Sequence, residues 1–425
     1  MQSPNRPAKL AAFLGLCAVF APPVAVAAGV VPDGGTATTV STGANGRQTV
    51  NIAPSVAGVS HNTYSSFNVG SAGADLNNTT VAARTIVNQV TSTNPSLIQG
   101  NIAVLGPRAN VILANSNGIT VDGGSFTNTG NVALTTGQVS FNDFTNSAGQ
   151  LQRNVVLNTN AGAINIGPGG LAGTMLNLEL IAKQVRVAGA MQNSYTDPNS
   201  RVRIVAGDTS VSPTDNLDPW ISYSSTGTGT PLGYAIDIAS GGSLTGGRIE
   251  LVATDQGAGV RHAGAAYATA GDFVVSSTGN LQLVSGSVQA ANDVLVNSAG
   301  LTGNGSLSAN RNIQIASNTV HLDHSTLSAG TGSQAGNIII GSAGQVHTEP
   351  VTIDHSTLTA TGGVGLYDAG PGVSMTATQL TAAQNVVAKV ASLSLNADGT
   401  GQTQWTSQQG TVAITAPGAV QLAGS

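Results

Sequence analysis

Short runs in which apolar and polar residues alternate recur along the chain. Four of these runs start at Asp272, Asp293, Asn312 and Asn337, at a fairly even spacing. Alternation with a period of two is typical of a β-strand, whose successive side chains point to opposite faces. Gly, Asn, Asp and Ser separate the runs, and these residues favour tight turns. The pattern therefore predicts short strands at a regular spacing.

A second repeat is almost identical in sequence. Leu322-Asp-His-Ser-Thr-Leu-Ser returns further along the chain as Ile353-Asp-His-Ser-Thr-Leu-Thr. A repeat of this size that holds two or three strands is typical of one coil of a parallel β-solenoid, in which inward apolar side chains stack about 4.8 Å apart. A propeller would show one signature per blade at about 40 residues, and none recurs.

The size of the repeat predicts the dimensions of such a rod. About 18 coils stacked at ~4.8 Å would give a length of up to ~85 Å. Insertions between coils would shorten it. We expect them in the polar, proline-containing stretch 193–230 and in the glycine-rich stretch 362–372.

Composition supports an all-β protein. Only 8% of the residues are charged and 4% are aromatic, whereas 40% are hydrophobic and 55 residues are glycine. Exposed faces of long helices are usually filled with Glu, Lys and Arg, and disordered chains combine high net charge with few apolar residues. Both classes are therefore excluded. The net charge of −5 and the absence of a basic run also argue against a nucleic-acid partner.

The start of the chain, over 1–28, has the pattern of a secretory signal peptide. Arg6 and Lys9 precede an apolar run over 10–20, and small residues follow, with cleavage expected after Ala27 or Ala28. The run is too short to anchor the chain in a membrane. It contains Cys17, the single cysteine, so the mature chain would have none.

The segment 30–140 carries a more specific series of motifs. It includes Gly58-Val-Ser-His-Asn-Thr-Tyr, Ala83-Arg-Thr-Ile-Val-Asn, Asn94-Pro-Ser-Leu-Ile-Gln-Gly and Ala109-Asn-Val-Ile-Leu-Ala-Asn-Ser-Asn-Gly-Ile-Thr-Val-Asp-Gly. Over this whole segment the series resembles the amino-terminal secretion domain of two-partner-secretion exoproteins, the filamentous-haemagglutinin family of Gram-negative bacteria. Ser116 stands where the family's second signature usually has Pro, and the insert that carries the first signature, Asn-Pro-Asn-Leu, is absent before Ala83.

The resemblance implies a right-handed parallel β-helix (a β-solenoid) with an amino-terminal cap and short antiparallel extra-helical hairpins. We accordingly expect a signal peptide over 1–28, a secretion cap with the first coils over 29–150, and a β-helix rod over 151–425. Each coil of the rod should contain roughly 19–25 residues, a length within the range of known solenoid repeats.

The resemblance also implies a partner, a dedicated outer-membrane transporter with periplasmic docking domains. The residues expected to contact it are Asn115, Asn117, Gly118 and Ile119, with Asn94, Pro95 and Leu97 as weaker candidates. The residues alone leave another interpretation open, because Asn117-Gly118 is a turn dipeptide between apolar strands and serves equally as a solenoid corner.

The function that follows is that of a secreted or surface-exposed, non-enzymatic adhesin that binds a receptor or glycan on a host or bacterial surface. Two alternatives stay open: a truncated platform of a contact-dependent-inhibition toxin, and a β-helical polysaccharide lyase or hydrolase. The enzyme hypothesis is the weaker one, because the aspartates are scattered along the chain and no Gly-x-Ser-x-Gly motif occurs.

Two further motifs have structural explanations. Gly167-Pro-Gly-Gly-Leu-Ala fits a loose dinucleotide fingerprint, but a strand pattern rather than a helix follows it, so we expect a solenoid corner. His321, Asp323, His324, Asp354 and His355 are ligand-type residues. The repeat places the two Asp-His pairs at equivalent coil positions, which favours an outward ladder. We therefore predict neither a metal nor a cofactor.

Overall fold

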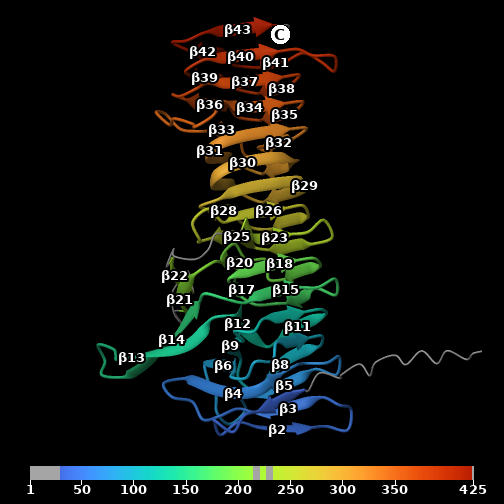
Figure 1. Cartoon of the computed structure of the whole chain (residues 1–425), viewed down its shortest axis with the longest axis vertical. Coiled ribbons are helices and arrows are strands. Elements are labelled where there is room, and N and C mark those ends of the chain that lie inside the picture. The colour runs from blue at the N-terminus through green and yellow to red at the C-terminus, as the bar shows by residue number, and fades with distance from the viewer. Residues whose placement is uncertain (1–28, 214–220, 226–232, 424–425) are drawn as a thin grey trace, which may run out of the picture.

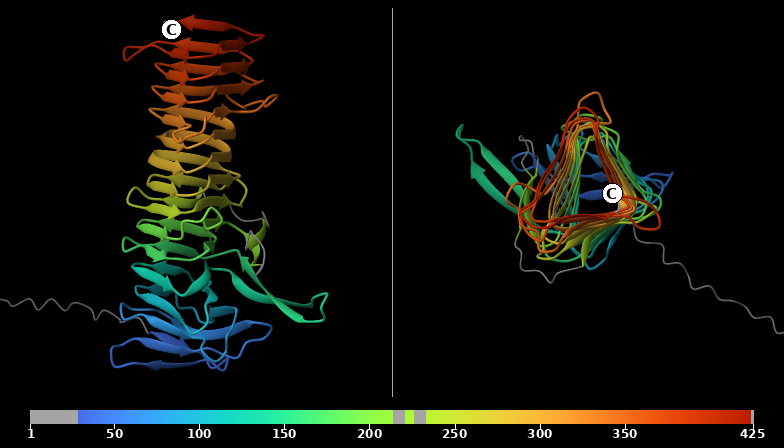
Figure 2. Two further views of the ribbon diagram at one scale, coloured as in Figure 1. Left: turned by 180° about the vertical axis from the view of Figure 1, so that it is seen from behind. Right: turned by 90° about the horizontal axis from the view of Figure 1, so that it is seen from above.

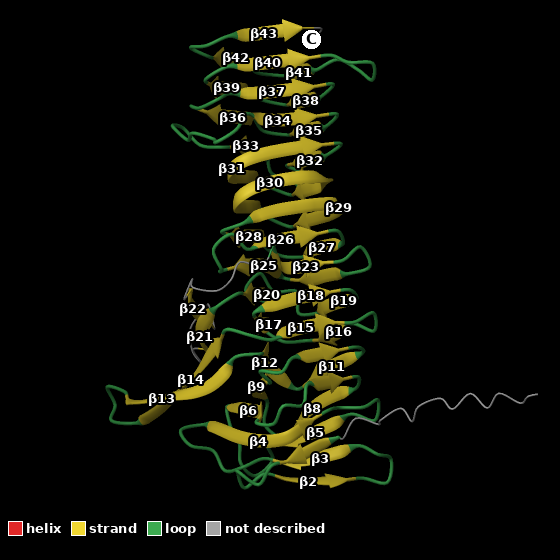
Figure 3. Ribbon diagram, viewed as in Figure 1, coloured by secondary structure: helices red, strands yellow, loops and turns green. Residues whose placement is uncertain are grey.

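The computed structural model describes residues 29–213, 221–225 and 233–423, and within them every regular element is a strand. No helix in the described part has the length and hydrophobicity to cross a membrane. The chain winds as a right-handed parallel β-solenoid of about 15 turns, which confirms the predicted fold (Figures 1 and 3). Seen along its axis, the rod is triangular (Figure 2).

Each side of the triangle is a stack of strands. The first face contains β4 (Val59–Phe67), β6 (Thr85–Val90), β9 (Ala109–Ala114), β12 (Thr129–Thr135), β17 (Asn177–Ala182), β20 (Arg201–Ala206), β25 (Arg248–Ala253), β28 (Phe273–Ser277), the start of β30 (Val294–Ala309), the start of β31 (Ile313–Asp323), β33 (Ile338–Ile340), β36 (Val364–Asp368), β39 (Val386–Val390) and β42 (Val412–Thr415).

The second face contains β7 (Ser96–Ile98), β10 (Ile119–Val121), β15 (Ala163–Ile166), β18 (Gln184–Val187), β23 (Tyr234–Ile238), β26 (Gly259–His262), the start of β29 (Asn280–Ala290), the middle of β30, the end of β31, β34 (Val351–Asp354), β37 (Val373–Thr376), β40 (Leu393–Asn396) and β43 (Val420–Ala423).

The third face contains β2 (Thr39–Thr42), β3 (Gln48–Asn51), β5 (Ala74–Asn77), β8 (Asn101–Leu105), β11 (Gly124–Thr127), β16 (Leu171–Gly173), β19 (Ala190–Asn193), β24 (Ser243–Gly246), β27 (Ala265–Ala268), the ends of β29 and β30, β32 (Thr326–Ala329), β35 (Thr357–Ala360), β38 (Gln379–Ala382) and β41 (Gln404–Ser407).

The repeats seen in the sequence are successive coils in register. Phe273, Val294, Ile313 and Ile338 lie one above another on the first face, and Asp323 lies opposite Asp354 on the second. On the first face, the spacing along the chain between equivalent residues ranges from 19, for Val294 and Ile313, to 26, for Val59 and Thr85, apart from two longer coils. The inward side chains form one continuous apolar core along the rod.

Antiparallel strands close the amino-terminal end of the rod. β1 (Val30–Pro32) runs antiparallel to β4, with Val30 opposite Phe67, and β2 runs antiparallel to β3. Beneath them the Tyr64 and Phe67 rings pack edge to face, 5.0 Å apart. The Tyr64 hydroxyl donates to Asn88 Oδ1 at 2.9 Å, so the polar end of this buried ring is satisfied.

The two longer coils are about twice the length of the others. Asn131 pairs with Asn177, and Arg201 pairs with Arg248, so each of these coils takes up nearly fifty positions of the chain. The additional residues form β13 (Gln138–Thr145), β14 (Leu151–Thr159), β21 (Thr209–Pro213) and β22 (Ile221–Ser225), an antiparallel sheet outside the rod (Figure 1). This extra-helical sheet joins the two insertions through the pairing of β14 with β21.

The expected insertions were only partly correct. Within 193–230, the stretch 201–206 is a regular coil strand, and the residues that leave the rod begin at about 209. The expected insertion over 362–372 is wrong, because β36 lies in register between β33 and β39. The antiparallel hairpin of β13 and β14 agrees with the extra-helical hairpins that the resemblance implied, but its position in the chain was not predicted. Because the extra-helical sheet uses about two coils' worth of residues, the rod has about 15 turns instead of about 18.

A second apolar core lies between the extra-helical sheet and the outer side of the first face. It consists of Val59, Val87, Ile112, Ala133, Val155, Leu157, Ile181, Val205, Val211 and Val252, with Val139 and Phe141 at its margin. The division of the chain at residues 150 and 151 stays a prediction; in the structure this position lies in the turn between β13 and β14.

A row of charged residues lies on the outer side of the same face, with Glu179 and Arg203 buried and Glu250 half-buried. Glu179, Arg203 and Glu250 occupy equivalent positions on β17, β20 and β25. Arg203 Nε lies 2.5 Å from Glu250 Oε2 but 3.9 Å from Glu179 Oε2. Burial raises the pKa of the Glu179 carboxyl to about 7; Arg203 opposes this shift and Glu250 adds to it.

Neighbouring residues on β31 should differ sharply in how much stability the protein loses when each is replaced by a charged residue. Ile313 is fully buried in the core, whereas the adjacent Gln314 is exposed. We expect Ile313→Asp to lower the free energy of unfolding by about 2 to 4 kcal/mol, because it buries an unpaired carboxylate. Gln314→Asp is the matched control and should change it by less than about 0.5 kcal/mol. Urea denaturation measures both, and equal losses would contradict the register described here.

The buried Glu179 should make stability depend on pH. Its pKa is higher in the folded state than the value of about 4.3 typical of an unfolded chain. Its contribution to stability is therefore complete below about pH 4.3 and is lost as the pH rises through about 7. Glu179→Gln removes this titration. Its stability relative to the parent should rise by about 1 to 3 kcal/mol between pH 5 and pH 8.

Urea denaturation of both proteins at the two pH values measures this difference. Glu349→Gln, a change at an exposed glutamate, is the control and should give no comparable pH-dependent difference. A constant difference between Glu179→Gln and the parent across this pH range would contradict the assignment.

Candidate functional site

The structure brings together the two asparagine motifs that the resemblance singled out. β10 pairs with β7, so that Ile119 lies opposite Ser96 and Thr120 lies opposite Leu97. The turn that precedes β10 therefore lies directly on the turn that precedes β7 in the previous coil. We call these two stacked turns, residues 92–97 and 115–119, the double corner.

Asn115 holds the double corner together from inside. It is 1% exposed, and its Nδ2 donates to the Asn94 carbonyl oxygen and to Ser96 Oγ, each at 2.9 Å. Its Oδ1 accepts from the backbone N–H of Asn117 at 3.0 Å. The buried side-chain amide of Asn115 thus provides hydrogen-bond partners for polar groups of the turns in both coils, which lie outside the strand ladders.

Asn117 and Gly118 turn the chain into β10, which begins at Ile119. Asn117 is exposed, and its Nδ2 donates to the Ser92 carbonyl oxygen at 2.7 Å. Gly118 has φ +111°, and an added Cβ would lie 3.2 Å from the Ala163 carbonyl oxygen, so both conformation and space favour glycine. Ile119 is buried in the core against Ile164.

A groove lies beside the double corner on the outside of the rod. Its volume is about 440 Å³, and it is lined by Ser66, Asn68, Asn94, Pro95, Ser96, Leu97 and Thr120. Asn94 and Pro95 are exposed and Leu97 is half-buried. The surface at this site is therefore provided by the weaker candidates together with Asn117, whereas Asn115, Gly118 and Ile119 form its support.

Asn68 is a member of this site that the sequence analysis did not identify. Its Oδ1 accepts from the Leu97 backbone N–H at 2.7 Å and so orders the groove across two coils. The sequence feature that could have indicated Asn68 is an asparagine directly after the apolar end of a strand, in Ser66-Phe-Asn-Val. The same position in Ala114-Asn is marked in the sequence by the glycine turn that follows it.

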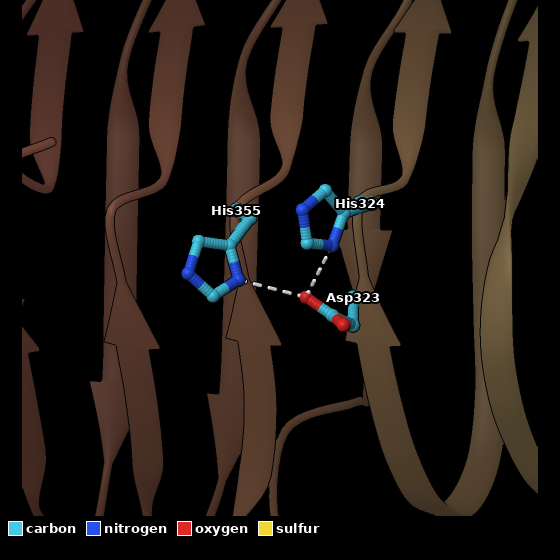
Figure 4. Close-up of side chains that lie close together, drawn as sticks. All are labelled: Asp323, His324 and His355. Atoms are coloured by element: carbon cyan, nitrogen blue, oxygen red, sulfur yellow. Dashed lines mark hydrogen bonds and ion pairs between the residues drawn. The ribbon is translucent and has the colours of Figure 1, made fainter. Parts of the chain in front are cut away.

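Further along the rod, the repeated Asp-His pairs meet at one outer corner. His324 Nδ1 and His355 Nδ1 lie 2.9 and 2.8 Å from Asp323 Oδ1 (Figure 4). His355 Nε2 lies 2.8 Å from Asp398 Oδ2. Hydrogen bonding to Asp323, and then to Asp398, raises the pKa of His355 above its ordinary value. The predicted outward ladder is confirmed in its register, since Asp323 lies opposite Asp354.

The glycine motif at 167–172 forms a solenoid corner, as predicted. It connects β15 to β16, and the Gly170 backbone N–H donates to the Gly167 carbonyl oxygen at 2.9 Å. The Gly169 N–H donates to Asp122 Oδ1 in the preceding coil at 2.6 Å. The expected cleavage site at Ala27 and Ala28 lies outside the described residues.

Known proteins are similar in sequence to this chain over most of its length. The TPS secretion domain family matches residues 28–283. Filamentous hemagglutinin of Bordetella pertussis (strain Tohama I) is 33% identical over 303 residues, which are 67% of this chain and 8% of that protein. The tRNA nuclease CdiA-2 of Burkholderia pseudomallei (strain 1026b) is 35% identical over 300 residues, 63% of this chain and 9% of the nuclease.

A solved structure gives the same result. The crystal structure of the filamentous hemagglutinin secretion domain is 29% identical to this chain with a TM-score of 0.58, and it is matched over its full length and 74% of this chain. The curated relatives are far longer than this chain, which spans less than a tenth of their length. The family match and the shared solenoid show that the chain belongs to the two-partner-secretion exoproteins that carry a TPS secretion domain.

Proposed function

We propose that this chain is a non-enzymatic adhesin, exported across the outer membrane by a dedicated two-partner-secretion transporter and displayed on the cell surface or released. The observation that carries the export step is the match of the TPS secretion domain family to residues 28–283. The proposed path runs through the periplasm, where the signal peptide is removed and the periplasmic docking domains of the transporter bind the double corner.

The proposed contact surface is the groove beside the double corner. Asn94, Pro95 and Leu97 line it, and Asn117 lies exposed on the adjoining turn. Asn115 and Gly118 act indirectly in this proposal, because they fix the shape of the turns without facing the docking domain. A docking domain that offers an apolar residue to Pro95 and hydrogen-bonding groups to Asn94 suits this surface.

Adhesion is supported by the outer surface of the rod. On the third face, outward Thr and Ser residues stack in register, as in Thr326 and Thr357 or Ser328, Thr359 and Thr381. Such rows give an extended polar surface of repeating hydroxyl groups, suited to a receptor or glycan on another surface. Apart from the extra-helical sheet and the amino-terminal cap, the described residues all belong to this rod, so the polar surface extends along much of its length.

A second candidate is the platform of a contact-dependent-inhibition toxin. It is favoured by the 35% identity to a relative named as a tRNA nuclease, of which this chain matches 9%. In that case a carrier rod like this one would present a separate toxic domain. Binding of the purified chain to host cells or glycans but not to neighbouring bacteria supports the adhesin, and binding to neighbouring bacteria alone supports the toxin platform.

Export should depend on the segment that contains the double corner. We expect deletion of 58–137 to leave the chain in the periplasm when it is produced together with its transporter. Deletion of 338–363, one complete coil outside the family match, is the control and should leave export intact. Immunoblots of the medium and of the periplasm measure the fractions. Equal release of both deletion variants would contradict the proposal.

Single substitutions should separate support from contact. Asn115→Ala leaves buried partners unsatisfied and should lower the free energy of unfolding by about 1 to 3 kcal/mol, with export reduced as well. The double change Pro95→Ala with Leu97→Ser should keep the thermal midpoint while export falls. Val387→Ser, at another half-buried outward strand position, is the matched control for both readouts. Normal export of the Pro95/Leu97 variant would remove the groove from the proposal.

A further inference from the structure

Asp323, His324 and His355 form a cluster of metal-ligand side chains outside the double corner. The cluster lies where β31 and β34 end on the second face, on two successive coils (Figure 4). One nitrogen of each histidine and one oxygen of Asp323 all lie within 4.8 Å of one another. The side chains are accessible: that of Asp323 is 62% exposed, that of His324 67% and that of His355 27%.

We propose that these three side chains bind one divalent transition-metal ion, with Zn²⁺ as the best-fitting species. In a tetrahedral site with bonds of about 2.0 to 2.2 Å, neighbouring ligand atoms are about 3.4 Å apart. The two His–Asp separations of 2.9 and 2.8 Å are slightly shorter, so small rotations of exposed side chains open the required space. Water would complete the coordination.

The histidines are already arranged as ligands. Their rings stack 4.7 Å apart with 22° between their planes, and both Nδ1 atoms point to the same carboxylate oxygen. Asp398, from the loop after β40, lies 2.8 Å from the other ring nitrogen of His355. A carboxylate that accepts from the remote N–H of a histidine fixes its ring orientation and strengthens it as a ligand, as outer-shell partners do in known metal sites.

The backbone at this corner holds the rings in place. His324 and His355 have φ +52° and +48°, and the equivalent residue of the next coil, Ala377, has φ +49°. The corner thus imposes a left-handed conformation whatever the side chain, and it directs two histidines from successive coils to the same side. The sequence repeat alone predicted the ladder; the convergence of both imidazoles on one oxygen is visible only in three dimensions.

The ligand set also indicates which ions are excluded. Two imidazoles and one carboxylate suit Zn²⁺, Co²⁺, Ni²⁺ or Cu²⁺, whereas Mg²⁺ and Ca²⁺ prefer oxygen ligands throughout. His321 lies outside the cluster, because it interacts with Thr352 and with Glu349, whose Oε2 lies 3.0 Å from its Nε2. The ion would join two coils and so stabilise the distal part of the rod by mass action.

Calorimetric titration of the whole chain, purified without a histidine tag, with ZnCl₂ tests the proposal. We expect one ion per chain with a Kd in the micromolar range, and no binding of Mg²⁺. His355→Ala and His324→Ala should each weaken binding at least about 30-fold, and Asp398→Asn about 10-fold. His321→Ala is the matched control, a histidine on β31, the strand that ends at Asp323, and should bind as the parent does.

Thermal unfolding gives a second readout. Saturating Zn²⁺ should raise the midpoint of the parent and of His321→Ala but not that of His355→Ala. All variants should retain the β-sheet circular dichroism of the parent, because the substituted side chains are on the surface. Absence of saturable binding up to about 1 mM Zn²⁺ would overturn the proposal, as would unchanged affinity in both cluster variants.

Discussion

Stacking of the backbone in parallel register is the constraint on which the rest of this structure depends. Every coil pairs its N–H and C=O groups with the coils above and below, so equivalent residues must have equivalent roles. Leu307, Leu327, Leu358 and Leu380 form one such column of inward side chains. A polar residue in that column would be buried without a partner. The inward positions of the strands are therefore restricted to apolar residues, and polar or charged side chains occur on the outer side and at the corners.

The corners have to satisfy backbone groups that the strands cannot pair. Asparagine does this at the double corner, where the buried amide of Asn115 joins two coils and shapes the surface that Asn94 and Pro95 present. The same residue type acts at Asn68, which accepts from the Leu97 N–H. Folding and recognition thus depend on the same turns, so a substitution that damages export has to be examined for stability before it is assigned to contact.

The sequence predicted the solenoid and much of its register, because alternation and small turn residues are local signals. The strands that begin near Asp272, Asp293, Asn312 and Asn337 lie on one face as expected. The extra-helical sheet was missed in part, because β13 and β14 alternate like coil strands. Their antiparallel pairing with each other and the pairing of Leu157 with Val211 place them outside the rod. The burial of Asn115 depends on contacts with Asn94 and Ser96 in the preceding coil, which no local pattern reports.

The direction of the hydrogen bonds also determines how the rod responds to force. They run between coils, which are stacked along the rod axis (Figure 1), so tension along that axis acts on all coil boundaries in series and the weakest boundary opens first. Each ordinary coil that detaches releases roughly 65 to 90 Å of extended chain. The extra-helical sheet interrupts this sequence, because the pairing of β14 with β21 ties the coil that begins with β12 to the coil that begins with β20, with the coil of β17 between them. Single-molecule stretching would register these coils as one larger and stronger step, so the rod is extensible distally and stiff beside the double corner.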